Sequence, residues 1–172
     1  SSVRQYISGD DVDKCLKFQA EGWEYAPKLM GVDVARFGDN VNAICVRQGR
    51  KVFPIETPPK QDLMTTAHHV AERIRRERPA RVFVDGSGVG GGVVDRLRQL
   101  GFSVIEVNGG NQSLDPKYLN KRVEMWWEMK EFIEGGQLDA AHADELDSRP
   151  ACIQRGHQFG GEQVARFEIG RA

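Results

Sequence analysis

Two aspartates, each at the end of a β-rich run, are the strongest candidates for chemistry. Asp33 ends the apolar run LMGVD, and Asp85 ends the run RVFVD, 52 residues later. If the two runs are neighbouring strands with their carboxyl ends on one side, both carboxylates converge on the crevice where α/β sheets bind ligands. Such a pair repels itself, and Mg²⁺ or Mn²⁺, which prefer oxygen ligands, relieve the repulsion. We interpret the pair as a metal-binding catalytic site, although each acid taken singly fits a capping or turn aspartate equally well.

A glycine-rich segment follows the second aspartate and permits another interpretation. Gly86, Gly88 and Gly91 satisfy G-x-G-x-x-G between a strand and a helix, with Glu106 about twenty residues further on, as in dinucleotide-binding proteins. Against NAD binding, Asp85 directly precedes the first glycine and would repel a pyrophosphate. The unit also follows an antiparallel hairpin instead of opening a parallel sheet. The simpler interpretation is that the glycines let the backbone turn sharply beneath the acid.

Other motifs for catalysis or metal binding are weak or missing. His68 and His69 are adjacent on a predicted helix, so their side chains point about 100° apart and do not share one metal there. His142 and His157 have no ligand partner at a familiar spacing. The sequence contains no G-x-S-x-G, H-E-x-x-H or Walker A motif, which argues against a serine hydrolase and against an ATPase.

The predicted elements that position the two aspartates alternate in type along the chain. A short helix over residues 9–20 begins after Ser8, a good N-cap, and a second helix begins after Asp62 and ends before Pro79. We expect strands at 29–35, 41–48, 51–56, 81–85, 102–107 and 164–169, with a tight turn at residues 49–50, and further helices at 93–101 and 117–136. The order βββαβαβα predicts an α/β fold with a mixed central sheet, three antiparallel strands followed by parallel strands, flanked by helices.

Composition restricts the class of protein. The 172 residues are 40% hydrophobic and 28% charged, which is typical of a soluble globular domain, and neither a spanning segment nor a signal peptide is visible. We therefore expect a cytoplasmic protein without a membrane partner. Cys15, Cys45 and Cys152 are too widely spaced for a disulfide framework or a zinc knuckle. The net charge of −1 does not suggest a nucleic-acid-coating polycation, and the arginine-rich run 73–81 is interpreted as a solvated helix face.

Four motifs taken together resemble a known family. GVDVARFGDN, VFVDGSGVGGGVVDRL, VIEVNGG and YLNKRVEMWWEMKEFIEGGQL, within roughly residues 28–138, are similar to the C-terminal nuclease domain of the large terminase subunit of tailed bacteriophages and prophages. The resemblance implies an RNase H-like fold and a metal-dependent endonuclease that cuts concatemeric double-stranded DNA during packaging, in the bacterial host cell. It places Asp33 and Asp85 on the first two catalytic acids, which hold two Mg²⁺ or Mn²⁺ ions for phosphodiester hydrolysis.

The resemblance also implies partners and domain limits. In the full protein the partners would be an N-terminal ATPase domain, the portal protein and the small terminase subunit. Residues 1–27 would be a linker and short helix from the preceding domain, and residues 28–172 the nuclease domain. Phosphates would be contacted by the arginine-rich helix and by Lys117, Lys121 or Arg122.

The sequence departs from the family at the third catalytic acid, which usually follows the last strand in a segment like SPDxADAL. That segment is missing, and Asp139, Asp144, Asp147 and Glu168 remain alternatives for its role. Asp39 resembles another motif position but is equally well placed for a turn. The competing hypothesis is therefore a catalytically impaired or truncated terminase domain that retains only DNA or portal docking.

Overall fold

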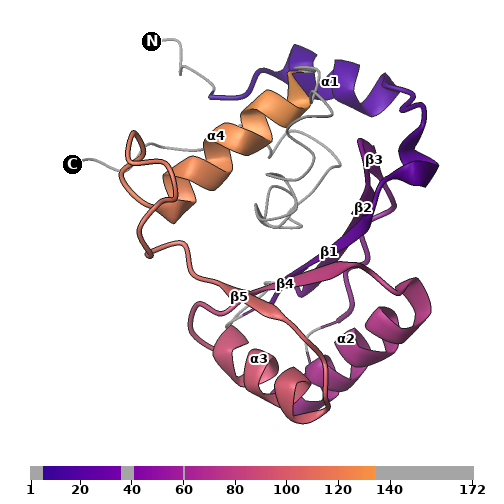
Figure 1. Cartoon of the computed structure of the whole chain (residues 1–172), viewed down its shortest axis with the longest axis vertical. Helices are drawn as coiled ribbons and strands as arrows, with labels where there is room; N and C mark the ends of the chain where they lie inside the picture. The colour runs from indigo at the N-terminus through magenta and orange to yellow at the C-terminus, as the bar shows by residue number, and fades with distance from the viewer. Residues whose placement is uncertain (1–5, 36–40, 60, 135–172) are drawn as a thin grey trace.

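A five-stranded mixed sheet organises the chain, which the computed structural model describes over residues 6–35, 41–59 and 61–134 (Figure 1). The strands lie in the order β3-β2-β1-β4-β5. Their bounds are β1 Lys28–Asp33, β2 Ala43–Gln48, β3 Lys51–Val52, β4 Arg81–Asp85 and β5 Ile105–Val107. The helices are α1 Gly9–Lys17, α2 Leu63–Glu77, α3 Gly90–Gln99 and α4 Lys121–Ile133, with a 3₁₀ turn at Trp23–Tyr25. The predicted element order and fold class are confirmed for these residues; the predicted strand at 164–169 lies outside them.

The antiparallel half of the sheet begins with β1 and β2, which pair from Lys28 opposite Gln48 to Asp33 opposite Ala43. Gly49, at φ 54°, turns the chain back into β3 as the sequence predicts. The third strand is much shorter than the predicted 51–56, because Pro54 has no backbone N–H to continue the ladder. Pairing resumes in a single bridge, where the amides of Ile44 and Glu56 exchange hydrogen bonds of 2.8 and 3.0 Å.

The parallel half consists of β1, β4 and β5, joined by helical crossovers. The Asp62 side chain caps α2 by accepting hydrogen bonds from the amides of Met64 and Thr65, as predicted. α3 begins at Gly90, three residues earlier than expected. It ends at Gln99, and Gly101, at φ 86°, then reverses the chain so that the amide of Phe102 donates to the Leu97 carbonyl. Strand β5 begins three residues later than the predicted run 102–107.

Helices cover both faces of the sheet. α2 and α3 lie together on one face (Figure 1), where Met30, Val32, Val82 and Val84 pack into the largest apolar cluster. α4 lies on the opposite side, and its Met125 packs with Leu29, Phe83 and Val107. Successive residues of a strand point to opposite faces, so β1 and β4 each contribute to both clusters. The apolar runs of β1 and β4 therefore form strands that are buried on both faces.

α4 starts later than predicted. The expected helix over 117–136 begins only at Lys121, because Asp115 closes a turn instead: its side chain accepts from the Lys117 amide and its carbonyl from the Tyr118 amide. Asn120 then caps the helix by accepting from the Val123 amide at 3.0 Å. The predicted stop at residues 135–136 lies outside the described residues.

The apolar stripe of α4 is a core, as predicted, and holds the first helix. Ile7, Met129 and Ile133 are buried together, with Trp126 and Phe132 packed around them. α1 follows its Ser8 cap, contacts α4, and ends at Lys17 instead of residue 20. Neither Cys15 nor Cys45 forms a disulfide bond, and Cys45 is buried. Over the described part of the chain, no helix combines the length and apolarity needed to cross a membrane.

Candidate active site

The register of the sheet brings Asp33 and Asp85 together. β1 and β4 run parallel and pair up to Val32 opposite Val84, so the next residue of each strand is an aspartate. Both carboxylates therefore stand side by side at the carboxyl ends of adjacent strands, as the sequence predicts. Both side chains are partly exposed.

The two aspartates also share a face. Val32 and Val84 point into the cluster beneath α2 and α3, and Phe83 points into the cluster beneath α4. Because side chains alternate along a strand, Asp33 and Asp85 lie on the α4 side. A ligand on that side meets two carboxylates at once.

The glycine-rich loop fixes the position of Asp85. Its Oδ1 accepts a hydrogen bond from the Ser87 amide at 2.8 Å, and the Gly86 amide donates to the Val107 carbonyl of β5 at 2.9 Å. A Cβ at Gly90 would lie 1.8 Å from the carbonyl oxygen of Asp85, so only glycine allows α3 to begin directly beneath the acid. This contact explains the early start of α3 and supports the interpretation of the glycines as a sharp turn.

The same loop is poorly arranged for a dinucleotide. The Glu106 side chain lies against Gly86, where a Cβ would meet its Cγ and Oε1 at 2.3 Å, and its carboxylate is 3.7 Å from Arg98. A negative charge therefore faces the first glycine of the fingerprint, in addition to Asp85. The first two strands pair antiparallel, whereas a dinucleotide-binding unit opens a parallel sheet.

The donor set suits a hard divalent cation. Two partly exposed carboxylates on adjacent strand ends offer oxygen ligands of the kind that Mg²⁺ and Mn²⁺ prefer. Within the described ranges, no group of three or more His, Cys, Asp or Glu side chains is arranged so that it could hold a metal ion. Asp39 lies outside the described residues. So do the four candidates for the third catalytic acid, Asp139, Asp144, Asp147 and Glu168.

One residue that supports the site was not found by sequence reasoning. Asn42 is 4% exposed, and its Oδ1 accepts a hydrogen bond from the Ala35 amide at 2.9 Å. It thereby anchors the backbone two residues after Asp33 to the start of β2. Its only sequence signal was an amide side chain directly before a buried strand, a position that turn residues often occupy.

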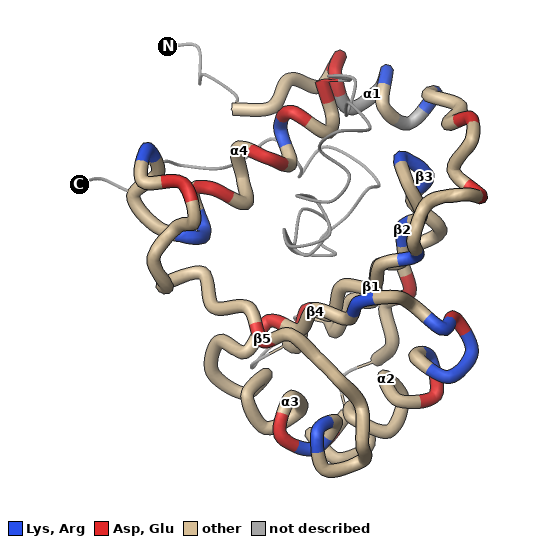
Figure 2. Tube along the Cα trace, viewed as in Figure 1, with Lys and Arg blue, Asp and Glu red and all other residues tan. Residues whose placement is uncertain are grey.

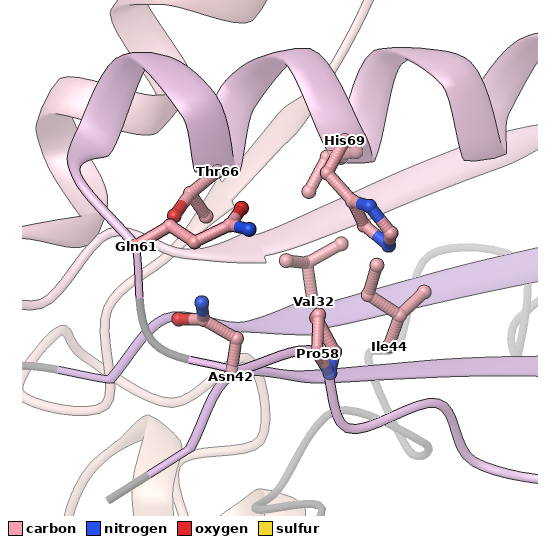
Figure 3. Close-up of a pocket in the computed structure, with 8 residues that line it drawn as sticks. Val32, Asn42, Ile44, Pro58, Gln61, Thr66 and His69 are labelled. Atoms are coloured by element: carbon pink, nitrogen blue, oxygen red, sulfur yellow. The ribbon is translucent and has the colours of Figure 1, made fainter.

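A small pocket lies on the other side of β1 from the acids, between α2 and the sheet (Figure 3). Its lining includes Val32, Asn42, Thr66 and His69. The His69 ring is 2.7 Å from Glu56, and His68 is exposed, so both histidines serve structure or surface, in line with the sequence interpretation. Neither belongs to the aspartate pair.

The arginine-rich run lies at the opposite edge of the sheet. The Ala80 amide donates to the Lys28 carbonyl, which places the end of α2 beside the amino ends of β1 and β4. Arg73 binds Glu56 at 3.0 Å and Glu77 at 3.5 Å, and basic and acidic residues are interspersed there (Figure 2). This helix end is a charge-paired surface and is not adjacent to the acids.

The other predicted phosphate contacts surround the start of α4. Lys117 pairs with Asp115 at 3.2 Å, and Lys121 pairs with Glu124, which is 1% exposed. Burial raises the pKa of Glu124, but hydrogen bonds from Lys121 and from the amides of Asp115 and Leu114 outweigh it, so the pKa lies below its ordinary value. Arg122 is exposed and its amide donates to the Gly109 carbonyl at 3.0 Å.

Comparison with known proteins identifies the fold. No family model matches the sequence, and no curated protein matches it. The structure is similar to the nuclease domain of the large terminase subunit gp2 of bacterial virus Sf6, with a TM-score of 0.62 and 18% identity, covering 76% of this chain. The chain spans 64% of the length of that domain. A variant of the same domain was determined with manganese, at a TM-score of 0.60 and 17% identity, with 76% and 64% of the two chains covered.

A second phage enzyme has the same architecture. The large terminase nuclease of thermophilic phage G20c matches with a TM-score of 0.52 and 15% identity over 79% of each chain. The chain therefore has the RNase H-like fold of phage terminase nuclease domains, which confirms the predicted fold and the resemblance at the level of structure.

Proposed function

We propose that the chain is a metal-dependent endonuclease domain that cuts double-stranded DNA by phosphodiester hydrolysis, with Asp33 and Asp85 as its catalytic metal ligands. The observation that carries the proposal is the parallel register of β1 and β4, which sets two aspartates side by side at one edge of an RNase H-like sheet. The two solved relatives with this fold are described as terminase nucleases. Outside such a role, two adjacent carboxylates are an electrostatic cost.

Each part of the site has a separate task in this proposal. When bound, Mg²⁺ or Mn²⁺ supplies Lewis acidity at the phosphoryl group and lowers the pKa of the attacking water. Asp33 and Asp85 would hold the ions, because the pairing of β1 with β4 ends one residue before each of them and sets them on adjacent strand ends. The Asp85 carboxylate is oriented by the Ser87 amide, and Asn42 steadies the backbone after Asp33. The protein thus presents a preorganised pair of ligands.

The biological setting is part of the same proposal. The enzyme would cut concatemeric phage or prophage DNA in the bacterial cytoplasm, together with an ATPase domain, a portal protein and a small terminase subunit. Residues 28–172 would be the nuclease domain and residues 1–27 its connection to the ATPase. The packing of Ile7 against Met129 and Ile133 supports a connection that is fastened to α4.

The test is cleavage of supercoiled plasmid by the chain with Mn²⁺, Mg²⁺ or EDTA. We compare the wild type with Asp33→Asn and Asp85→Asn, which keep side-chain shape, and with Asp95→Asn, an exposed acid on α3. The expected result is metal-dependent nicking that falls at least about a hundredfold in the first two variants and is unchanged in the third. In parallel, Mn²⁺ raises the melting temperature of the wild type but not that of Asp85→Asn.

Two other outcomes decide against parts of the proposal. Full activity of Asp33→Asn and Asp85→Asn would remove these residues from the site. A folded wild type that gains stability from Mn²⁺ but never cuts DNA would establish the competing function, a catalytically impaired domain that only docks.

A further inference from the structure

The cations at the start of α4 differ in whether they already have an anionic partner. Lys117 binds Asp115, and Lys121 binds the buried carboxylate of Glu124. Arg122 makes no ion pair with any residue in the described ranges, and it is exposed. Of these three residues, which the resemblance suggested as phosphate contacts, only Arg122 lacks an anionic partner among the described residues.

The position of Arg122 relative to the acids follows from the sheet. Val107 is the register partner of Asp85, and Asn108 and Gly109 follow it at the carboxyl end of β5. The Arg122 amide donates to the Gly109 carbonyl at 3.0 Å, and a Cβ at Gly109 would lie 3.1 Å from Nε. The guanidinium therefore lies on the backbone just beyond β5, on the same edge of the sheet as the aspartate pair.

The loop beneath Arg122 is braced. The Asn108 side chain accepts from the Gly110 amide at 2.9 Å, and the Lys121 amide donates to the Asn111 carbonyl at 2.8 Å. Glu124 ties the following segment to α4 through the amides of Leu114 and Asp115. The backbone from which the Arg122 side chain extends is therefore held in place by hydrogen bonds.

We propose that Arg122 binds a backbone phosphate of the DNA strand that lies across the aspartate pair. This inference rests on the proposed nuclease function and extends it to the way the substrate is held. Two carboxylates repel the DNA polyanion except where a metal intervenes, so an exposed cation at the same edge is needed to hold the flanking backbone. A guanidinium presents two parallel N–H donors that match phosphate oxygens, whereas the paired cations at the far edge already have carboxylates.

The test measures binding and cutting separately. DNA affinity is determined in Ca²⁺ at several salt concentrations, and cleavage in Mn²⁺, for the wild type, Arg122→Gln and Arg122→Lys. The control is Arg75→Gln, which removes one charge from the distant end of α2, where Arg75 and Glu72 are both largely exposed. Thermal melts accompany each variant.

Arg122→Gln is expected to weaken DNA binding about three- to tenfold near 0.1 M salt and to reduce the slope of log affinity against log salt by about one. Arg122→Lys keeps the charge and should recover most of the slope, which a purely structural role would not produce. Arg75→Gln should match the wild type. Gly109→Ala, which must displace the guanidinium by a few tenths of an ångström, should weaken binding less than Arg122→Gln.

The inference and the proposed function fail in different ways. If the wild type cuts DNA through Asp33 and Asp85 while Arg122→Gln binds like Arg75→Gln, only the phosphate contact is overturned. If the wild type neither binds nor cuts DNA, the nuclease function and the phosphate contact are overturned together. Should Arg122→Gln be unstable, Gly109→Ala decides the matter, because DNA binding equal to that of the wild type would then overturn the phosphate contact.

Discussion

The two ends of the strand pair β1–β4 differ in how their charges are arranged. At the amino ends, Lys28 binds Glu77 at 3.1 Å, and Arg73 bridges Glu77 and Glu56. At the carboxyl ends, Asp33 and Asp85 are register neighbours of like charge. The same two strands thus carry a set of complementary charges at one edge and a pair of like charges at the other.

The difference distinguishes charges that stabilise the fold from charges that the proposed function requires. Complementary charges at the amino edge stabilise the junction of α2 and β4, and they would do so in any α/β domain. Two adjacent carboxylates repel each other, and a cation between them would relieve that repulsion. The like charges at the carboxyl edge are what the proposed metal site requires, and the close backbone packing around Asp85 holds that residue at the strand end.

Among substitutions that test the difference between the two edges, Gly90→Ala at the carboxyl edge is expected to lower the stability most. The new Cβ would lie 1.8 Å from the Asp85 carbonyl oxygen, which is backbone and cannot move aside. We expect a loss of at least about 3 kcal/mol in the free energy of unfolding, measured by urea denaturation. The matched control is Gly91→Ala, whose Cβ meets only the Gly86 oxygen at 3.6 Å. Equal stability of the two variants would contradict the role assigned to Gly90.

An intermediate effect is expected from Glu124→Gln, beside the carboxyl edge. The substitution weakens the acceptor for the Lys121 ammonium and two amides in a buried place, so we expect a loss of about 1–3 kcal/mol at pH 7. Because the pKa of Glu124 is depressed from 4.5, its stabilisation is present above that value and is lost as pH falls through the lower folded-state pKa.

The pH dependence of Glu124→Gln is measured by urea denaturation between pH 7 and pH 3. The difference from the wild type should shrink as the pH is lowered below 4.5. A difference that stays constant with pH would show that the charge of Glu124 is not what stabilises the loop. Glu131→Gln, on the same helix, serves as a control for removing a negative charge from α4.

The smallest effect is expected at the amino edge, from Glu77→Gln. Its carboxylate is 3.1 Å from Lys28 and 3.5 Å from Arg73, with a fifth of the side chain exposed, and such pairs contribute about 1 kcal/mol or less. We expect a slightly lower melting temperature, more so at low salt, and unchanged metal-dependent cleavage. A large loss of cleavage would contradict the assignment of this edge to structure alone.

The aspartate pair was predictable from the sequence because its signal is local and repeated. Each acid ends an apolar β-branched run, and parallel neighbours bring such ends together, so strand identity was enough to place both. The caps at Ser8 and Asp62 were equally visible, since N-cap chemistry depends on a few adjacent residues. The resemblance supplied the fold name, which the comparisons then confirmed.

The features that the sequence did not reveal depend on contacts between distant residues. Asn42 reaches Ala35 across a chain reversal. The late start of α4 depends on a turn at Asp115 that competes with helical periodicity. The contrast between the paired Lys121 and the available Arg122 requires the buried position of Glu124, which no charge pattern indicates. Which of these cations lacks an anionic partner among the described residues was therefore open until the fold was known.

The packing of α1 on α4 has a mechanical consequence. Ile7 is enclosed by Met129 and Ile133, and Arg50 of the β2–β3 turn donates to the Phe132 carbonyl at 3.0 Å. Tension applied to the chain before Ile7 would therefore act first on its contacts with the end of α4, and only afterwards on β1.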